Sequence, residues 1–181
     1  MASGSGDLSR HPDLGGLGAS MRSEWAAEQN DAAADAREQW QHNQTLRDWL
    51  TDAMHAGDRL AVTVLDQRFT GTVEELGADL LGLRCIFGRV DIHLALGITL
   101  QIELVDHPAS GGHRGSTEAT FAGVLTARDP LVDTSVGTLH VPEGLDGIMS
   151  SGRDFVRVKA RAGAETIVPI EQIAWVCNRR V

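Results

Sequence analysis

A run of alternating basic side chains near the carboxyl end is the pattern with the clearest capacity for chemistry. Successive residues of a β-strand point to opposite faces. Arg157, Lys159 and Arg161 would therefore share one face of a strand, with Arg153 just before it. A row of cations can contact the phosphates of RNA or single-stranded DNA. We therefore treat these four residues as candidate nucleic-acid-binding residues.

The same pattern has a simpler interpretation, which we favour. Charged side chains are common on solvated strands at sheet edges, where they discourage aggregation. Base stacking requires aromatic side chains on the binding face, and Phe155 is the one aromatic residue in this run. The formal net charge of −9 also argues against a general binder of polyanions.

Two tryptophans near the amino end indicate a different kind of contact. Trp25 and Trp40 lie in a helix-forming segment, residues 21–44, that is otherwise polar and rich in alanine. Large aromatic side chains contribute much of the binding energy of protein interfaces. We predict that this helix mediates association with a protein partner or a second copy of the chain, and that Trp25 and Trp40 make the contact. A fully exposed helix is the alternative.

Residues that could act in catalysis or hold a metal form no known pattern. Asp79 and Asp154 each follow a glycine turn, where an aspartate typically accepts backbone hydrogen bonds. The seven histidines lack metal-ligand spacing, and Cys85 and Cys177 lie in apolar strand patterns that predict buried, reduced thiols. We predict a protein that is not an enzyme and has no cofactor or metal. An enzyme with an unrecognised site is a less favoured hypothesis.

The composition is typical of a globular protein from a bacterium with a GC-rich genome. Of the 181 residues 42% are hydrophobic, arginine far outnumbers lysine, and tyrosine is absent. The sequence has no apolar run of the roughly 18–20 residues that a membrane helix needs, and residues 1–18 lack the apolar segment of a signal peptide. We predict a cytoplasmic protein that does not bind membranes.

The elements that must position these residues repeat along the chain. Residues 45–106 align without a gap on residues 120–181, so that Thr45 meets Thr120 at an offset of 75 positions. Apolar positions largely stay apolar, and several glycines coincide. A repeat of this kind predicts two copies of one folding unit.

Each copy has the pattern of a helix followed by five short strands. In the first copy Thr45 is suited to cap the helix and Gly57 to end it. Leu60–Val64 then begins the alternation with period two that is typical of strands. Glycines at the turns allow strongly bent strands, which can curl into a small barrel. We predict a mainly β protein with an N-terminal helix and two tandem five-stranded β-barrels, each preceded by a helix.

The predicted domain organisation has five parts. A tail and a linker rich in small and polar residues are expected to lack fixed structure. The parts are a disordered tail (1–20), a helix for association (21–44), the first barrel (45–106), a linker (107–118) and the second barrel (119–181).

Two motifs carry a resemblance to known small barrels. F-x-G-x-V-x-x-x-G-x-D-L-L-x-L, which begins at Phe69, resembles the Sm-like and SH3-like barrels. G-x-D-F-V-x-V from Gly152, followed by V-P-x-x-x-I-x-x-V, is similar to a group of actinobacterial proteins with tandem small barrels and no established activity. Leu81 and Val156 stand where RNA-binding members of the Sm class carry asparagine. The resemblance therefore implies a fold and does not extend RNA binding to this chain.

Together these patterns favour a non-catalytic binding or scaffold protein whose partner is a protein. Binding of RNA or single-stranded DNA by the basic strand face of the second copy is the alternative function.

Overall fold

The computed structural model describes residues 13–96, 100–108, 111–112, 115, 117–128 and 133–178 of the chain. The predicted tail over residues 1–12 lies outside this part. The chain forms two compact units, Met1–Thr45 and Leu46–Val181.

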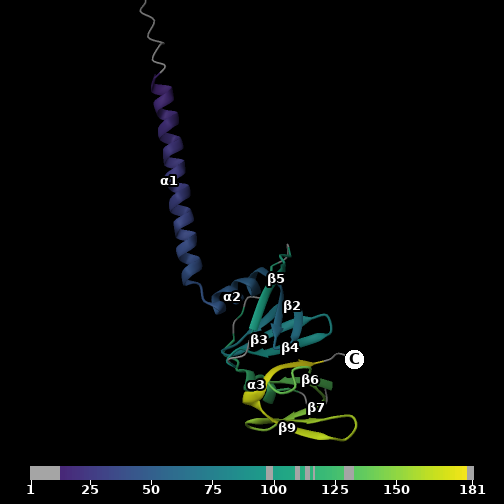
Figure 1. Ribbon diagram of the computed structural model, residues 1–181. Coiled ribbons are helices and arrows are strands. Elements are labelled where there is room, and N and C mark those ends of the chain that lie inside the picture. The colour runs from purple at the N-terminus through teal and green to yellow at the C-terminus, as the bar shows by residue number, and fades with distance from the viewer. Residues whose placement is uncertain are drawn as a thin grey trace, which may run out of the picture. The chain divides into compact units, whose positions relative to one another are not determined.

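The first unit contains one long helix, α1, over Asp13–Asn43 (Figure 1). Its 31 residues give a length of about 46 Å at about 1.5 Å per residue. Alanine and glutamate, both strong helix formers, recur through it. The helix was predicted from residue 21, so the prediction of disorder is wrong for residues 13–20. In the described part of the chain, no helix is both long enough and apolar enough to cross a membrane.

The second unit begins with a helix and five strands that we call the N-half, residues 46–106. The helix α2 (Leu46–Ala56) packs Leu50, Ala53 and Met54 into the core. The strands pair in the order β5-β1-β2-β3-β4. Their bounds are β1 Arg59–Val64, β2 Gln67–Leu76, β3 Leu80–Cys85, β4 Gly88–His93 and β5 Leu100–Asp106.

The rest of the unit, which we call the C-half (residues 117–178), repeats this plan. The short helix α3 (Phe121–Thr126) is capped by Thr120, whose side chain accepts a hydrogen bond from Gly123 N, as its sequence position predicts. The strands pair in the order β10-β6-β7-β8-β9, which is again fifth, first, second, third, fourth. The elements are β6 Asp133–Thr138, β7 Leu145–Ser151, β8 Phe155–Lys159, β9 Glu165–Pro169, the 3-10 turn η1 Ile170–Gln172, and β10 Ile173–Asn178.

Equivalent turns of the two halves are closed by equivalent hydrogen bonds. Gly77 N donates to Leu80 O at 2.8 Å, and Gly152 N donates to Phe155 O at 2.7 Å. The carbonyls of the two equivalent aspartates likewise accept bonds from the segment after the fourth strand. Those bonds are Leu94 N to Asp79 O at 2.8 Å and Ile170 N to Asp154 O at 2.9 Å.

The two halves form one sheet. Strand β4 pairs antiparallel with β10, so that Ile92 lies opposite Trp175 and Asp91 opposite Val176. The result is a ten-stranded sheet in which β5 and β9 are the end strands among the described residues (Figure 1). The protein is mainly β with a helix before each half, as predicted. The sheet is not closed, so the predicted arrangement of two separate barrels is not confirmed.

Strand β10 contributes to both parts of the hydrophobic core. Trp175 and Cys177 belong to the cluster that fills the N-half, whereas Ile173 and Val176 belong to the cluster of the C-half. Trp175 packs edge-on against Phe69, with ring centroids 5.0 Å apart. Trp175 is thus a core residue, with 3% of its surface exposed.

Both cysteines are buried and unbonded to each other, as predicted. Burial raises the pKa of the Cys85 thiol to about 11, and the neighbouring Cys177 adds to the shift. The Cys85 thiol is therefore poorly suited to act as a nucleophile near neutral pH.

Three described residues of the predicted linker are bound to the sheet unit. Gly112 N donates to His55 O at 2.9 Å, and Thr117 N donates to Leu76 O at 3.2 Å. The His107 ring lies 2.8 Å from the carboxylate of Asp58. The prediction of a free linker over residues 107–118 is therefore wrong at these positions, because backbone and side-chain hydrogen bonds hold them.

Candidate interaction surfaces

Helix α1 presents an exposed apolar stripe. Met21, Trp25 and Trp40 are 66%, 69% and 59% exposed, although all three are large and apolar. Ala32 and Ala36 continue the same side of the helix, because steps of three and four residues return to one face. Met21 and Trp25, with Ala26 and Gln29, line a shallow groove of about 320 Å³. The two tryptophans singled out by sequence are thus both exposed on one long helix.

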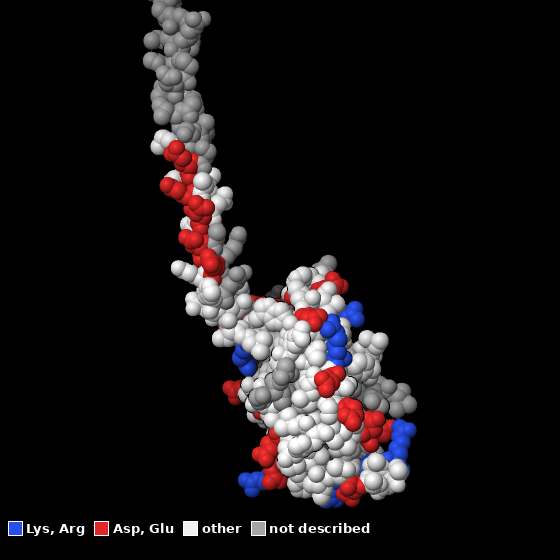
Figure 2. Space-filling model, viewed as in Figure 1, with Lys and Arg blue, Asp and Glu red and all other residues white. Residues whose placement is uncertain are grey.

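An acidic stripe lies beside the apolar one on α1. Glu28, Asp31, Asp35 and Glu38 are exposed and follow one another at steps of three or four residues. Each residue of an α-helix advances about 100° around the helix axis. At this spacing the acidic stripe is centred about 100° around the axis from the apolar stripe. Figure 2 shows the acidic side chains as a red row along the helix.

The four candidate nucleic-acid-binding residues of the C-half are exposed, and two of them form ion pairs. Arg157 and Lys159 alternate on β8 with the buried Val156 and Val158, as predicted. Arg157 Nε lies 2.7 Å from Glu165 of the adjacent strand β9. Arg161 was predicted to share the strand face, but it lies in the turn that follows β8. It forms an ion pair with Asp133.

These pairs reduce the positive field that a phosphate backbone would meet. Arg153 lies in the bend before β8 and is exposed, and so it does not extend the row on the strand. On the face that Figure 2 shows, basic and acidic side chains are interspersed over the sheet unit. The four residues are accessible, but they do not form a continuous cationic surface.

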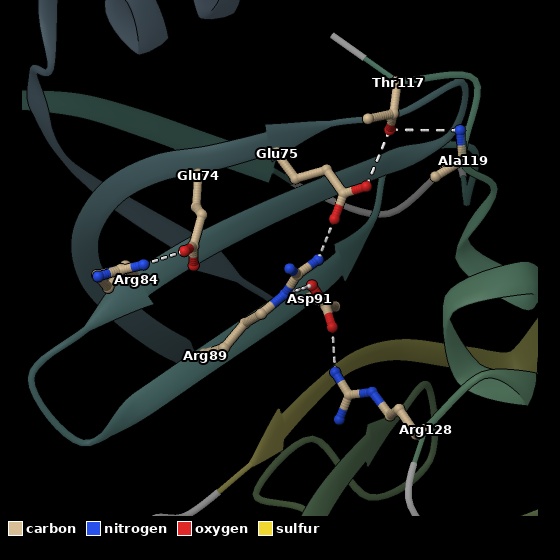
Figure 3. A network of polar contacts seen from close by, with 8 residues as sticks. All are labelled: Glu74, Glu75, Arg84, Arg89, Asp91, Thr117, Ala119 and Arg128. Carbon is tan, nitrogen blue, oxygen red and sulfur yellow. Dashed lines mark hydrogen bonds and ion pairs between the residues drawn. The ribbon is translucent and has the colours of Figure 1, made fainter. Parts of the chain in front are cut away.

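A network of charged side chains joins the two halves where β4 meets β10 (Figure 3). Asp91 of β4 is 1% exposed and forms an ion pair with Arg128, whose side chain is 8% exposed and which follows α3. Arg128 also donates to the side-chain oxygen of Asn178 at the end of β10. Arg89 Nε donates to Asp91 Oδ1 at 2.8 Å.

The network continues across the N-half. Arg89 also pairs with Glu75 of β2, whose other carboxylate oxygen accepts a hydrogen bond from Thr117 Oγ1 at 2.9 Å. Burial opposes the charge of Arg89, but Asp91 and Glu75 outweigh it, so that its pKa is raised above the usual value. This partly buried network connects β4 to the segment after α3 and to β10, although Arg128 Nε is buried without a hydrogen-bond partner among the described residues. Its role is to fix the junction between the halves.

Sequence reasoning did not find this network. The available signal is Asp91 itself, which lies between Val90 and Ile92 in an apolar strand. A charged residue at such a place is almost never buried without a partner. Its partner Arg128 is 37 residues away and could not be identified from spacing.

The two equivalent aspartates have different surroundings. Asp79 Oδ1 accepts a hydrogen bond from Phe121 N at 2.7 Å, at the first turn of α3, and its other oxygen is 3.5 Å from His93 Nε2. The His93 ring stacks on Phe121, with centroids 4.6 Å apart. Asp79 therefore links the N-half to α3 rather than closing its own turn, which had been the favoured interpretation. The side chain of Asp154 is exposed, and the carbonyl of Asp154 accepts the bond from Ile170 N.

A pocket of about 400 Å³ also lies between the halves. Trp175 forms part of its wall, and the indole Nε1 of Trp175 is buried without a hydrogen-bond partner among the described residues. The hydroxyl of Ser135 donates a hydrogen bond to the carboxylate of Asp146. Within the described residues no group of three metal-ligating side chains converges. The lining residues are Gln67, Arg68, Phe69, Phe87, Ser135, Glu143, Trp175 and Cys177.

Comparison with protein-family models and with curated proteins gives no match for this chain, so neither comparison indicates a function.

Proposed function

We propose that this chain is a non-catalytic protein-association module, in which α1 is the contact surface and the ten-stranded unit is the scaffold. The observation that carries the proposal is the exposure of Trp25 and Trp40, at 69% and 59%, on a single long helix. Large exposed apolar residues in one stripe are typical of interaction sites.

The energetics favour a covered α1. Isolated helices gain little stability in water without packing of an apolar face. Covering the exposed parts of two tryptophans would contribute roughly 5 kcal/mol, at about 25 cal/mol for each Å² of apolar surface removed from water. A partner that binds this stripe would therefore stabilise both the complex and the helix.

We further propose that the two halves are copies of one Sm-like small barrel, opened and joined edge to edge. The shared strand order and the matching turn hydrogen bonds support this relationship. The proposal includes kinship with the actinobacterial proteins whose motifs the sequence resembles.

Co-purification of the tagged full chain from cells of its source organism tests the functional proposal. We expect specific partner proteins that survive nuclease treatment and that are lost with the double substitution Trp25→Ala and Trp40→Ala. A matched control replaces two exposed isoleucines of the sheet unit, Ile86→Ala and Ile167→Ala, which are 91% and 62% exposed. A set of partners that is the same for both double variants would contradict the proposal.

Binding of RNA or single-stranded DNA is the second candidate, favoured by the exposed alternation of Arg157 and Lys159 on β8. The ion pairs of Arg157 and Arg161 make it the less favoured one. A titration with single-stranded oligonucleotides at about 50 mM salt, where phosphate contacts are strong, tests it. Affinity that falls in the double variant Arg157→Ala and Arg161→Ala would support this candidate, and absence of binding would exclude it.

A further inference from the structure

The charge of the protein is concentrated on α1. Residues 13–43 contain six acidic residues and two arginines, a net charge of −4 within a chain of net charge −9. Glu28, Asp31, Asp35 and Glu38 form the acidic stripe, and all four are exposed. This stripe spans about 15 Å along the helix, at about 1.5 Å per residue.

The acidic stripe borders the apolar stripe on one side only. On the other side, helical spacing places Ala26, Asn30 and Ala33, which are exposed and uncharged. Any helix that packs on Trp25 and Trp40 must therefore lay one of its own flanks against a row of carboxylates. The flanks of paired helices decide which partners and orientations are accepted.

A second copy of α1 fits this surface poorly. In an antiparallel pair like flanks meet, so that the two acidic stripes would face each other. In a parallel pair each acidic stripe would face the flank with Ala26, Asn30 and Ala33, whose described side chains offer no positive charge to the four carboxylates. Like charges at helix flanks destabilise a pair.

We propose that the occupant of α1 is an amphipathic helix of another protein, whose apolar stripe is bordered by a row of lysine or arginine residues. This inference rests on the proposed function and names the class of partner. Trp25 and Trp40 supply the buried contact, and the four carboxylates accelerate association and select the orientation of the incoming helix. The same stripe repels nucleic acids and anionic lipid surfaces.

Two synthetic helical peptides serve as probes. Both carry the same leucine and alanine stripe, and they differ only in having lysine or glutamate at the flanking positions. Binding to the full chain is measured by anisotropy of the labelled peptide at about 50 mM and about 500 mM salt. We expect the lysine peptide to bind at least about ten-fold more tightly at low salt, and this ratio to shrink at high salt, because ions screen exposed charges.

Three variants of the full chain locate the effect. Asp31→Asn, Asp35→Asn and Glu38→Gln together should remove most of the preference for the lysine peptide. Trp25→Ala with Trp40→Ala should abolish binding of both peptides. The matched control neutralises three exposed carboxylates of the sheet unit and should change nothing, with far-UV circular dichroism to verify the helix content of each variant. That control is Glu118→Gln, Glu143→Gln and Glu171→Gln.

The outcomes separate this inference from the proposed function. Equal binding of the two peptides, binding of neither, or a preference that survives neutralisation of α1 would overturn the basic-helix partner. So would a dimer of the chain alone that Trp25→Ala and Trp40→Ala dissociate in sedimentation equilibrium. Cellular partners that depend on the two tryptophans would still support the proposed function in each of those cases.

Discussion

The fourth strands of the two halves have the same place in the fold but opposite surroundings. Strand β4 is covered by β10, whereas β9 is an end strand of the sheet among the described residues. In the register of the strands, Leu81 pairs with Ile92 and its equivalent Val156 pairs with Val168. Asp91 therefore corresponds to Ile167, one residue away from the position that the gapless sequence alignment assigns to it. The charged Asp91 is 1% exposed, and the apolar Ile167 is 62% exposed.

This inversion shows which features belong to the repeated unit and which belong to the junction. Strand order and turns are common to both halves, and so they follow from the alternation and glycines of each half. The burial of Asp91 depends on Arg128 from the other half, and so it arises only where the halves meet. Asp91 can stay charged in the interior because Arg128 is held beside it as a partner.

A second difference lies across the first and fifth strands. In the N-half, Val62 lies opposite Ile102; in the C-half, Gly137 lies opposite Trp175. A side chain at Gly137 would overlap the indole of Trp175. The two pairs fill similar space with different residues, because Gly137 leaves room for the large indole of Trp175.

The largest expected effect comes from breaking the junction network. Asp91→Ala leaves Arg128 nearly buried without its carboxylate, and we expect a loss of about 3–5 kcal/mol in the free energy of unfolding. Arg161→Ala removes an exposed ion pair and should cost less than about 1 kcal/mol. Urea unfolding of both variants compares them. Equal losses would show that the junction pair is no more important than a surface pair.

Exchanging residues between the halves should cost somewhat less. Gly137→Val introduces the N-half residue against Trp175, and we expect a loss of about 1–3 kcal/mol or more from overpacking. Trp175→Ile alone should also destabilise, because it leaves a cavity beside Phe69. The double variant recreates the N-half pair, and the two effects should couple by about 1–3 kcal/mol in a double-mutant cycle. Strictly additive losses would mean that the two positions do not share space.

The smallest effect concerns the two thiols, which lie in the same core cluster although one comes from each half. Because the pKa of Cys85 is raised to about 11 from 9.0, the folded state disfavours its thiolate. This contribution to stability is fully present below pH 9 and is lost as the pH rises from 9 towards 11. Stability should fall modestly over that range, and less so in Cys85→Ala.

The same thiols report whether the halves unfold together. In increasing urea at pH 8, a thiol reagent should modify Cys85 and Cys177 in one common transition. Two separate transitions would show that the halves are independent domains rather than one unit.

The strands themselves could be predicted from the sequence because their signals are local. The alternation that predicts a strand over Leu60–Val64 lies within β1, which covers Arg59–Val64. The pairing of β4 with β10 could not be predicted, because every end strand of a sheet offers unpaired backbone groups. Everything built on that pairing, including the Asp91–Arg128 contact and the pocket beside Trp175, was inaccessible for the same reason. The exposure of Trp25 and Trp40 could be predicted, since the segment around them is polar and its apolar stripe is too narrow for a core-facing helix.

Oxidative footprinting of the chain in cells tests the central claim, that the tryptophan stripe of α1 is covered by a partner. The oxidation of Trp25 and Trp40 is compared between the purified chain and the chain in intact cells, with the buried Trp175 as the internal standard. We predict that Trp25 and Trp40 are readily oxidised in the purified chain and protected in cells. Equal oxidation of both tryptophans in the two settings would contradict the claim.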